Sequence, residues 1–350
     1  MTAIGHENGN NAASVPAPQV SIVIPLFNRV LFTQVCMRAL AATISPEETE
    51  VLFVDNGSTD GTAALLAALP APFRALRHPT NEGFARACNQ GAAAAWGQYV
   101  LFLNNDTVPQ PGWLDALLAV TAHDPAPTII GARLLFPDDT VQHAGIGFNS
   151  RDEPVHRAYG APLDDATALR SCPVPAVTGA CLLMERARFL ALGGFDEGYR
   201  NGFEDLDLCC RVRQGGGIVW YAAESILYHF ESASAGRYHA DEANYQRFRE
   251  RWADWLAMDL LVQETIPAAS GPVRLNRTYA TGADMRRELD RVIADAATFT
   301  AEFARLDAAY RELTAAFGRQ ETWAQSLETD ARRVRDRARW QRLVGRLLKM

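Results

Sequence analysis

Acidic side chains and one histidine gather in the sequence between positions 194 and 229. This segment contains Gly-Phe-Asp-Glu at 194–197, Phe-Glu-Asp-Leu-Asp at 203–207, and His229 within Tyr-His-Phe-Glu-Ser. A site that activates a hydroxyl and holds a divalent cation needs a base, oxygen ligands and often an imidazole close together. The alternative is a helix N-terminus whose acidic residues suit the helix dipole. The segment alone leaves both interpretations open.

Three apolar runs upstream are expected to form the framework that positions these residues. Residues 21–25, 50–55 and 99–103 are rich in Ile, Val, Leu and Phe, and helix-length segments separate them. This alternation predicts an α/β fold with a mainly parallel sheet covered on both faces. In such sheets, polar residues just past the carboxyl ends of the strands line the ligand crevice. Seven residues have that position: Pro25, Asn28, Asp55, Asn56, Asp60, Asn104 and Asp106.

Six short motifs follow one another along the chain. They are Ile-Pro-Leu-Phe-Asn at 24–28, Val-Asp-Asn-Gly-Ser-Thr-Asp-Gly-Thr at 54–62, Asn-Glu-Gly-Phe-Ala at 81–85, Leu-Asn-Asn-Asp-Thr at 103–107, Val-Thr-Gly-Ala-Cys at 177–181 and Phe-Glu-Asp-Leu-Asp at 203–207. In this order they resemble the motifs of family 2 glycosyltransferases of the GT-A fold, within them the bacterial rhamnosyltransferase-like branch. The resemblance spans residues 19–256, and six ordered motifs are specific where one would be weak.

The resemblance implies a Rossmann-like nucleotide-sugar-binding domain and a non-processive, inverting glycosyltransferase. The donor would be dTDP-rhamnose or a UDP-sugar, and the acceptor a hydroxyl of a glycan or lipid-linked molecule in cell-surface polysaccharide biosynthesis. Processive synthases of the family carry membrane helices and a Gln-x-x-Arg-Trp motif. Residues 246–252 read Gln-Arg-Phe-Arg-Glu-Arg-Trp, which does not fit that motif. We therefore expect the addition of one sugar, or few.

The resemblance also implies a divalent cation that neutralises the diphosphate leaving group. It assigns Asp106 as one metal ligand and His229 as the second. Where the family often has Asp-x-Asp, this chain has Asn104-Asn105-Asp106, so the first carboxylate is an amide and the site is less acidic. An imidazole ligand favours Mn²⁺ over Mg²⁺, which prefers oxygen ligands. The alternative for His229 is a core histidine after a strand.

An inverting transfer needs a carboxylate opposite the diphosphate, within hydrogen-bond reach of the acceptor hydroxyl. The resemblance assigns Asp205 as this general base. Glu204 beside it would keep the local field negative, and Asp207 is interpreted as structural. The pocket for the donor sugar and the acceptor is expected to include Gly179, Ala180, Phe203 and Trp220.

The donor nucleotide is expected beside the first strands. There Asp55 would accept the N3–H of uracil or thymine, with Pro25 and Asn28 bordering the same base. Asp60 would reach the ribose or cap a helix, and Arg86 would touch phosphate or lie on a solvated helix face. The other residues that the resemblance assigns to the nucleotide pocket are Asn56, Asn81, Gly83, Asn89, Asn104 and Asn105.

The chain is long enough for one catalytic domain and an appendage, with 350 residues that are 48% hydrophobic and 21% charged. We predict a disordered tail at 1–18, a GT-A domain at 19–260, a linker at 261–283 and a helical region at 284–350. The tail lacks the features of a signal peptide, and no apolar run is long enough to span a membrane. Six cysteines without C-x-x-C spacing fit a reduced cytoplasm. We expect no nucleic-acid partner.

The helical region has two sequence patterns. From Met285 to Phe317, apolar residues recur at alternating spacings of four and three, which predicts a coiled coil and self-association. A long helix packed on its own catalytic domain is the alternative. Residues 331–350 carry seven Arg and one Lys against one Asp, and their apolar residues form one helical stripe. This pattern is typical of a helix on the anionic inner face of the cell membrane; a solvated end or docking onto the acidic catalytic domain are the alternatives.

Two other functions are compatible with a related fold. One is a catalytically inactive nucleotide-sugar-binding scaffold, because fold alone does not specify activity. The joint presence of Asp106, Asp205 and His229 argues against it. The other is a sugar nucleotidylyltransferase, which opens with a Gly-rich loop followed by arginine. Residues 21–29 contain no glycine, which disfavours that reaction.

Overall fold

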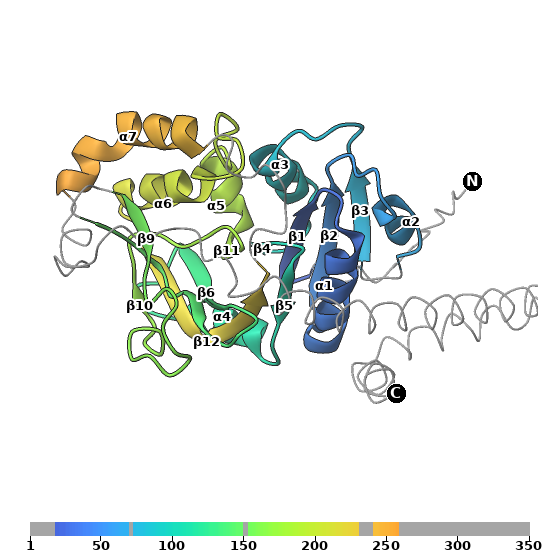
Figure 1. Ribbon diagram of the computed structural model, residues 1–350, viewed down its shortest axis with the longest axis horizontal. Helices are drawn as coiled ribbons and strands as arrows, with labels where there is room; N and C mark the ends of the chain where they lie inside the picture. Colours follow the sequence, from blue (N-terminus) through green and yellow to red (C-terminus); the bar gives the residue numbers. More distant parts are fainter. Residues whose placement is uncertain (1–17, 70–72, 150–152, 231–240, 259–350) are drawn as a thin grey trace, which may run out of the picture.

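The computed structural model describes residues 18–69, 73–149, 153–230 and 241–258 (Figure 1). The predicted linker and helical region, and nearly all of the predicted tail, lie outside these residues. The coiled coil and the basic helix at 331–350 therefore stay predictions, as does the division of the chain into domains. In the described part of the chain, no helix is long and apolar enough to cross a membrane.

A mixed sheet forms the centre of the described structure (Figure 1). Its first half is parallel, in the order β3-β2-β1-β4, with the strands β1 (Val20–Leu26), β2 (Thr49–Asp55), β3 (Phe73–Arg77) and β4 (Tyr99–Leu103). Next comes β11 (Cys181–Glu185), which is antiparallel to β4 and to its other neighbour, β6 (Ile129–Leu135). Beyond it, β12 (Val219–His229) runs parallel to β6. The predicted α/β sheet is therefore present, and one reversed strand divides its parallel parts.

Several short strands extend this sheet or lie beside it. The strand β5 (Thr107–Pro109) pairs antiparallel with β12, and β7 (Val141–His143) pairs antiparallel with β6. At the edge, β10 (Cys172–Pro173) pairs with β12, while β8 (Ile146–Phe148) and β9 (Pro154–His156) form a separate hairpin. The pairing of β5 with β12 places His229 opposite Thr107, the residue that follows Asp106 in the sequence.

Helices cover both faces of the sheet, as the apolar runs predict. One face packs against α1 (Val30–Thr43), α2 (Thr62–Ala67) and α4 (Trp113–Val120). The other packs against α3 (Phe84–Ala94), α5 (Arg186–Ala191), α6 (Glu204–Gln214) and α7 (Asp241–Met258). Successive side chains of a strand point to opposite faces. Accordingly Ile22 and Ile24 lie in one core and Val23 in the other.

All six cysteines are reduced thiols in the described residues. Five are buried, and Cys172 on β10 is partly exposed. Burial, which disfavours a charged thiolate, raises the pKa of Cys36 and of Cys209 to about 12. These thiols act as small apolar core residues.

Candidate active site

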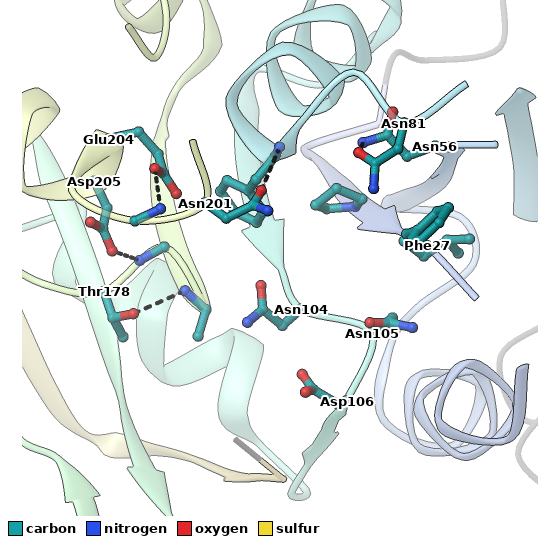
Figure 2. Close-up of a pocket in the computed structure, with 16 residues that line it drawn as sticks. Phe27, Asn56, Asn81, Asn104, Asn105, Asp106, Thr178, Asn201, Glu204 and Asp205 are labelled. Carbon is teal, nitrogen blue, oxygen red and sulfur yellow. Dashed lines mark hydrogen bonds between the residues drawn. The ribbon is translucent and has the colours of Figure 1, made fainter. Parts of the chain in front are cut away.

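A cavity of about 260 Å³ opens where β1, β2 and β4 end (Figure 2). Carboxyl ends of parallel strands meet at one edge of a sheet, so the loops that follow them converge there. Ten of the residues singled out from the sequence line the cavity: Pro25, Asn56, Asn81, Asn104, Asn105, Asp106, Gly179, Ala180, Glu204 and Asp205. The structure thus brings together acids and amides from four distant stretches of chain.

Asp106 on the floor of the cavity contacts His229, which lies behind the lining residues. Asp106 lies in the short turn between β4 and β5, and His229 is the last residue of β12. Because β5 and β12 pair, the Phe230 N–H donates to the Asp106 carbonyl at 3.0 Å, and His229 Nε2 lies 3.1 Å from Asp106 Oδ1. The Asn104 amide nitrogen is 3.2 Å from the same ring nitrogen. Strand pairing therefore brings both predicted metal ligands together.

The atoms around Asp106 fit a divalent cation. Its buried Oδ1 receives no hydrogen bond from any described residue, although His229 Nε2 faces it. A buried, unpartnered carboxylate oxygen beside an imidazole nitrogen is a suitable pair of ligands for Mn²⁺. Within the described ranges, no three His, Cys, Asp or Glu side chains converge on one point. Asp106 and His229 are therefore the two side chains described here that could hold a divalent cation between them.

One wall of the cavity carries the two adjacent acids of α6. Asp205 Oδ2 accepts the Gly179 N–H at 2.7 Å, and Asp205 Oδ1 accepts the Leu206 N–H at 2.8 Å. Glu204 is buried, and its Oε2 accepts the Gly202 N–H at 2.7 Å (Figure 2). These backbone donors fix the direction of both side chains. Each oxygen of Asp205 keeps a second lone pair for another partner.

The turn that precedes α6 has an unusual backbone. Residues 201–203 have three consecutive positive φ angles of 53°, 143° and 73°, and only the middle one is glycine. Such angles cost energy in other residues and persist where the surroundings impose them. Helix α7 imposes them here. Asn244 donates to the Arg200 carbonyl and accepts its N–H, and Phe248 packs on Phe203 with ring centroids 5.6 Å apart.

The opposite wall is formed by an amide network around Asn56. Its Nδ2 donates to Asn81 Oδ1 and to the Gly83 carbonyl, both at 3.0 Å. Its Oδ1 accepts the Glu82 N–H at 3.0 Å and faces His78 Nδ1 at 3.1 Å. All the hydrogen-bonding capacity of this amide is used. Asn56 therefore shapes the loop at 78–83, which contributes Asn81 to the cavity.

Asp55 lies behind this wall and does not line the cavity. Its side chain is 0% exposed; Oδ1 accepts the Ser58 N–H at 2.9 Å, and Oδ2 lies 3.3 Å from Arg77 Nε. The carboxylate holds the turn after β2. Its Oδ2 receives no hydrogen bond from the described residues, and the expected contact with a nucleobase stays a prediction.

Asn28 and Asp60 also lie outside the lining, where they join two loops. Asn28 Oδ1 accepts the Thr59 N–H at 2.7 Å. Asp60 accepts the N–H groups of Val30 at 3.0 Å and of Thr62, the first residue of α2, at 2.9 Å. Asp60 thus joins the start of α1 to the turn before α2, whose N-cap residue is Gly61. The expected contact with the ribose stays a prediction.

Further residues expected at the site point elsewhere. Arg86 pairs with Glu82 at 2.8 Å on a half-exposed helix face. Trp220 packs edge-on against His123, with ring centroids 5.0 Å apart, and Phe203 packs on α7. Two others support loops: Gly83 accepts from Asn56, and Asn89 bonds to the backbone of Phe195.

Six lining residues were not singled out from the sequence. They are Leu26, Phe27, Phe84, Thr178, Asn201 and Gly202. Phe27 is 43% exposed, a large value for an aromatic side chain beside polar groups. Four of the six are apolar or lack a side chain, so a search for polar residues passes over them. The Asn201-Gly202 pair could have been predicted from the sequence, because Asn-Gly marks a turn and it lies directly before the two acids.

Several known proteins are similar to this chain in sequence or in fold. Residues 21–186 match the family described as glycosyl transferase family 2. The O-antigen biosynthesis protein RfbC of Myxococcus xanthus is 34% identical over 256 residues, which cover 68% of this chain and 19% of that protein. The N-acetylglucosaminyl-diphospho-decaprenol L-rhamnosyltransferase of Mycobacterium tuberculosis (strain ATCC 25618 / H37Rv) is 30% identical over 212 residues, 53% of this chain and 68% of the relative.

A solved structure has a similar fold at low identity. GalNAc-T7, crystallised with UDP, GalNAc and Mn²⁺, aligns with a TM-score of 0.53 and 18% identity. The alignment covers 73% of this chain and 52% of that one. At this level of identity the comparison concerns the fold.

Proposed function

Because this chain belongs to glycosyl transferase family 2 and has the GT-A fold, we propose that it is a non-processive, inverting glycosyltransferase. It would move a sugar from a nucleotide diphosphate sugar, dTDP-rhamnose or a UDP-sugar, to a hydroxyl of a glycan or lipid-linked acceptor in cell-surface polysaccharide biosynthesis. The O-antigen and rhamnosyltransferase relatives support this choice of donor and acceptor.

The observation that carries the proposal is the placement of three groups of polar and aromatic side chains around one cavity. Figure 2 shows Asp205 on one side, Phe27 and the Asn56 network on the other, and Asp106 on the floor between them. A donor lying across the floor would leave its anomeric carbon near the carboxylate wall. This is the geometry that in-line attack requires, with base and leaving group on opposite sides of the sugar.

In this arrangement Asp205 accepts the proton of the acceptor hydroxyl as that oxygen attacks the anomeric carbon. The backbone donors of Gly179 and Leu206 hold the carboxylate in one orientation, so little reordering is needed. Glu204 shapes the turn through the Gly202 N–H. Phe27 offers a flat, exposed ring on which a nucleobase can stack.

Asp106 and His229 would hold the cation, which we infer to be Mn²⁺, with Mg²⁺ as the alternative. When bound, it would neutralise the developing charge of the nucleoside diphosphate. The Mn²⁺ in GalNAc-T7 and the unpartnered Asp106 Oδ1 support this inference. Asn104, which stands where the family often has an acid, would contribute at most a neutral ligand.

A panel of nucleotide sugars tests the proposal. Purified protein is melted with each donor, with and without Mn²⁺, because a ligand that binds the native state raises the melting temperature. We expect a rise with one dTDP- or UDP-sugar, larger with Mn²⁺, and loss of activity in chelator that Mn²⁺ restores. The best donor is then incubated with lipid-linked and glycan acceptors, and the anomeric configuration of the product is read by NMR.

The same experiment separates the alternative functions. An inactive scaffold would bind a donor but release no nucleoside diphosphate with any acceptor. A nucleotidylyltransferase would instead release pyrophosphate from a nucleoside triphosphate. Full transfer activity in chelator would contradict the metal-dependent reaction.

We further propose that the protein acts in the cytoplasm, at the inner face of the cell membrane, through residues 331–350, and that it self-associates through the predicted coiled coil. The charge and the apolar stripe of the sequence support the first proposal. Co-sedimentation with anionic vesicles that is lost in high salt, and lost on truncation after Thr329, would be the expected result. Equal binding by the truncated protein would contradict it.

A further inference from the structure

A buried glutamine lies directly behind His229. Gln142, the middle residue of β7, is 2% exposed, and His229 is 3% exposed. The amide makes two contacts with this one residue: Gln142 Nε2 donates to the His229 carbonyl at 3.2 Å, and Gln142 Oε1 lies 2.6 Å from His229 Nδ1. Both the backbone and the ring of His229 are therefore fixed by one side chain from β7, a strand that pairs with β6 as β12 does.

These two contacts determine which ring nitrogen carries the hydrogen. A carbonyl oxygen only accepts, so the end of the amide that faces the His229 carbonyl must be the NH₂ group. The amide oxygen therefore faces Nδ1. Since that oxygen also only accepts, Nδ1 must be the protonated nitrogen, and in the neutral ring Nε2 keeps its lone pair.

The lone pair on Nε2 faces the Asn104 amide nitrogen at 3.2 Å, a neutral contact that a cation could replace. Nε2 is 3.1 Å from Asp106 Oδ1, and among the described residues that oxygen receives no hydrogen bond. With the opposite tautomer, Nε2–H would donate to Asp106, and neither atom would be available to a metal. Gln142 thus selects between an unprotonated Nε2, which could exchange its contact with Asn104 for a cation shared with Asp106, and an Nε2–H that is bonded to Asp106.

We propose that Gln142 is a positioning residue for the metal site: it holds His229 in the Nδ1–H tautomer and so presents Nε2, together with Asp106, to a divalent cation. Metal-bound histidines commonly donate their other N–H to an oxygen acceptor in this way, and loss of that acceptor typically costs 10–100-fold in metal affinity. This inference rests on the proposed function, because it concerns the cation expected in that reaction.

A purely structural role is the competing explanation. Gln142 connects β7 to the end of β12, so its bonds could serve only to hold these strands together. In that case a substitution would lower the melting temperature but would leave the tautomer and the metal affinity of the folded protein unchanged. The two roles are therefore separated by measurements on His229 and on Mn²⁺, rather than by stability.

Three variants of the full chain carry the test. Gln142→Met keeps length and burial but removes the acceptor, whereas Gln142→Glu keeps an acceptor for Nδ1–H and loses the donor to the carbonyl. Gln110→Leu is the matched control, because Gln110 Nε2 donates to the Val108 carbonyl on the adjacent strand β5 and does not touch His229. Thermal melts establish that each variant is folded.

The first measurement is made without metal. Long-range ¹⁵N–¹H spectra of histidine-labelled protein at pH 8.5, where free imidazole is neutral, report the protonated nitrogen. His229 is assigned from the His229→Gln spectrum. We expect Nδ1–H in the wild type, in Gln142→Glu and in Gln110→Leu, and a shift towards Nε2–H in Gln142→Met. A wild-type ring with hydrogen on Nε2, or a Gln142→Met ring unchanged from Nδ1–H, would overturn the proposal.

The second measurement is Mn²⁺ affinity by EPR of the free ion. We expect Gln142→Met to bind about 10–100-fold more weakly and Gln142→Glu to stay near the wild type. If Gln142→Glu loses as much affinity as Gln142→Met, or if the wild type binds no Mn²⁺, the proposal fails. Sugar transfer by the wild type is scored separately, so an absence of transfer would reject the proposed function while the tautomer result still decides the role of Gln142.

Discussion

The two walls of the cavity are built by different means. The wall with Phe27, Asn56 and Asn81, which is called the nucleotide-side wall after the role proposed for it, follows the ends of two neighbouring parallel strands. Its central amide, Asn56, satisfies all its hydrogen bonds within residues 78–83. The wall with the acids begins in a turn with three positive φ angles. That turn keeps its shape because α7 packs behind it.

The two walls meet where the Phe84 N–H donates to Asn201 Oδ1 at 3.2 Å, but different contacts shape each of them. The nucleotide-side wall depends on the contacts of Asn56 with residues 78–83. The wall with the acids depends on a helix that begins at Asp241, well after Asp205. Asp207 links α6 to α7. Its side chain is 0% exposed and contacts Arg211, Arg251 and the Trp252 indole at 2.7, 3.0 and 2.9 Å. Changes at α7 should therefore affect catalysis before they affect donor binding.

The largest effect is expected from Asp207→Ala. The substitution leaves the guanidinium groups of Arg211 and Arg251 without a buried carboxylate, and breaking such a pair costs about 3–5 kcal/mol. Urea denaturation should show a loss of this size in the free energy of unfolding. The control is Asp115→Ala, an exposed aspartate in the first turn of α4, which should cost less than about 1 kcal/mol. Equal losses would show that Asp207 does not link α6 to α7.

Asp205→Asn tests whether the wall with the acids acts in catalysis and not in donor binding. The amide keeps the shape of the side chain, but its single oxygen can accept only one of the two backbone N–H groups, and it cannot take the proton of the acceptor. We expect kcat to fall by at least about a hundredfold, or ~2.7 kcal/mol in activation free energy. The dissociation constant of the donor, measured by calorimetry, should stay the same. A parallel loss of donor affinity would instead place Asp205 in donor binding, and Glu204→Gln should cost less than Asp205→Asn.

Phe27→Ala tests the other wall in the same way. Loss of a stacked ring should weaken donor binding by about 1–2 kcal/mol, or about 5–30-fold. The rate at saturating donor should change little, and Phe27→Tyr, which keeps the ring, should bind the donor normally. A large fall in kcat with unchanged donor affinity would show that Phe27 does not act on the nucleotide side.

The smallest effect is expected from Asp60→Asn, which tests the loops behind the nucleotide-side wall. Partial burial opposes ionisation, but hydrogen bonds from Thr62 and Val30 outweigh it and lower the pKa of Asp60 below its ordinary 3.8. The ionised form thus stabilises the fold at pH values above 3.8, and this contribution is lost as pH falls through the lowered pKa. Because Asp60 is exposed, we expect only a few tenths of a kcal/mol at pH 7.

Unfolding of wild type and Asp60→Asn in urea measures this contribution. The difference in the free energy of unfolding should be present at pH 7 and should shrink in strong acid. A difference that grows as pH falls would contradict the hydrogen-bonding role of the carboxylate.

The same contrast explains what the sequence could predict. Strand ends are visible as apolar runs followed by polar residues, so Pro25, Asn56, Asn104 and Asp106 were correctly expected at one edge of the sheet. Their neighbour Asp55 has the same sequence position, yet its carboxylate is held behind the wall by the Ser58 N–H and by Arg77. Position in the sequence therefore predicts which residues lie at the edge of the sheet, but not which side chains face the cavity.

Features that depend on distant packing were beyond the sequence pattern. The reversed direction of β11 follows from its pairing with β4 and β6, and no local signal encodes it. Trp220 was expected near an acceptor because it is aromatic, yet its strand places it against His123. The role of Gln142 could not be predicted, because a single glutamine becomes informative only when the fold brings β7 close to the end of β12.

The unequal burial of the cysteines makes the protein suited to site-specific labelling. Cys172 is the partly exposed thiol, while the other five are enclosed in the core and two have a pKa of about 12. A thiol-reactive fluorophore should therefore attach to Cys172 in the folded protein without removal of any other cysteine. Since β10 pairs with β12, the strand that ends in His229, the dye would sit on the same sheet as the site. Binding of donor, metal or acceptor could then be followed optically in the otherwise unmodified chain.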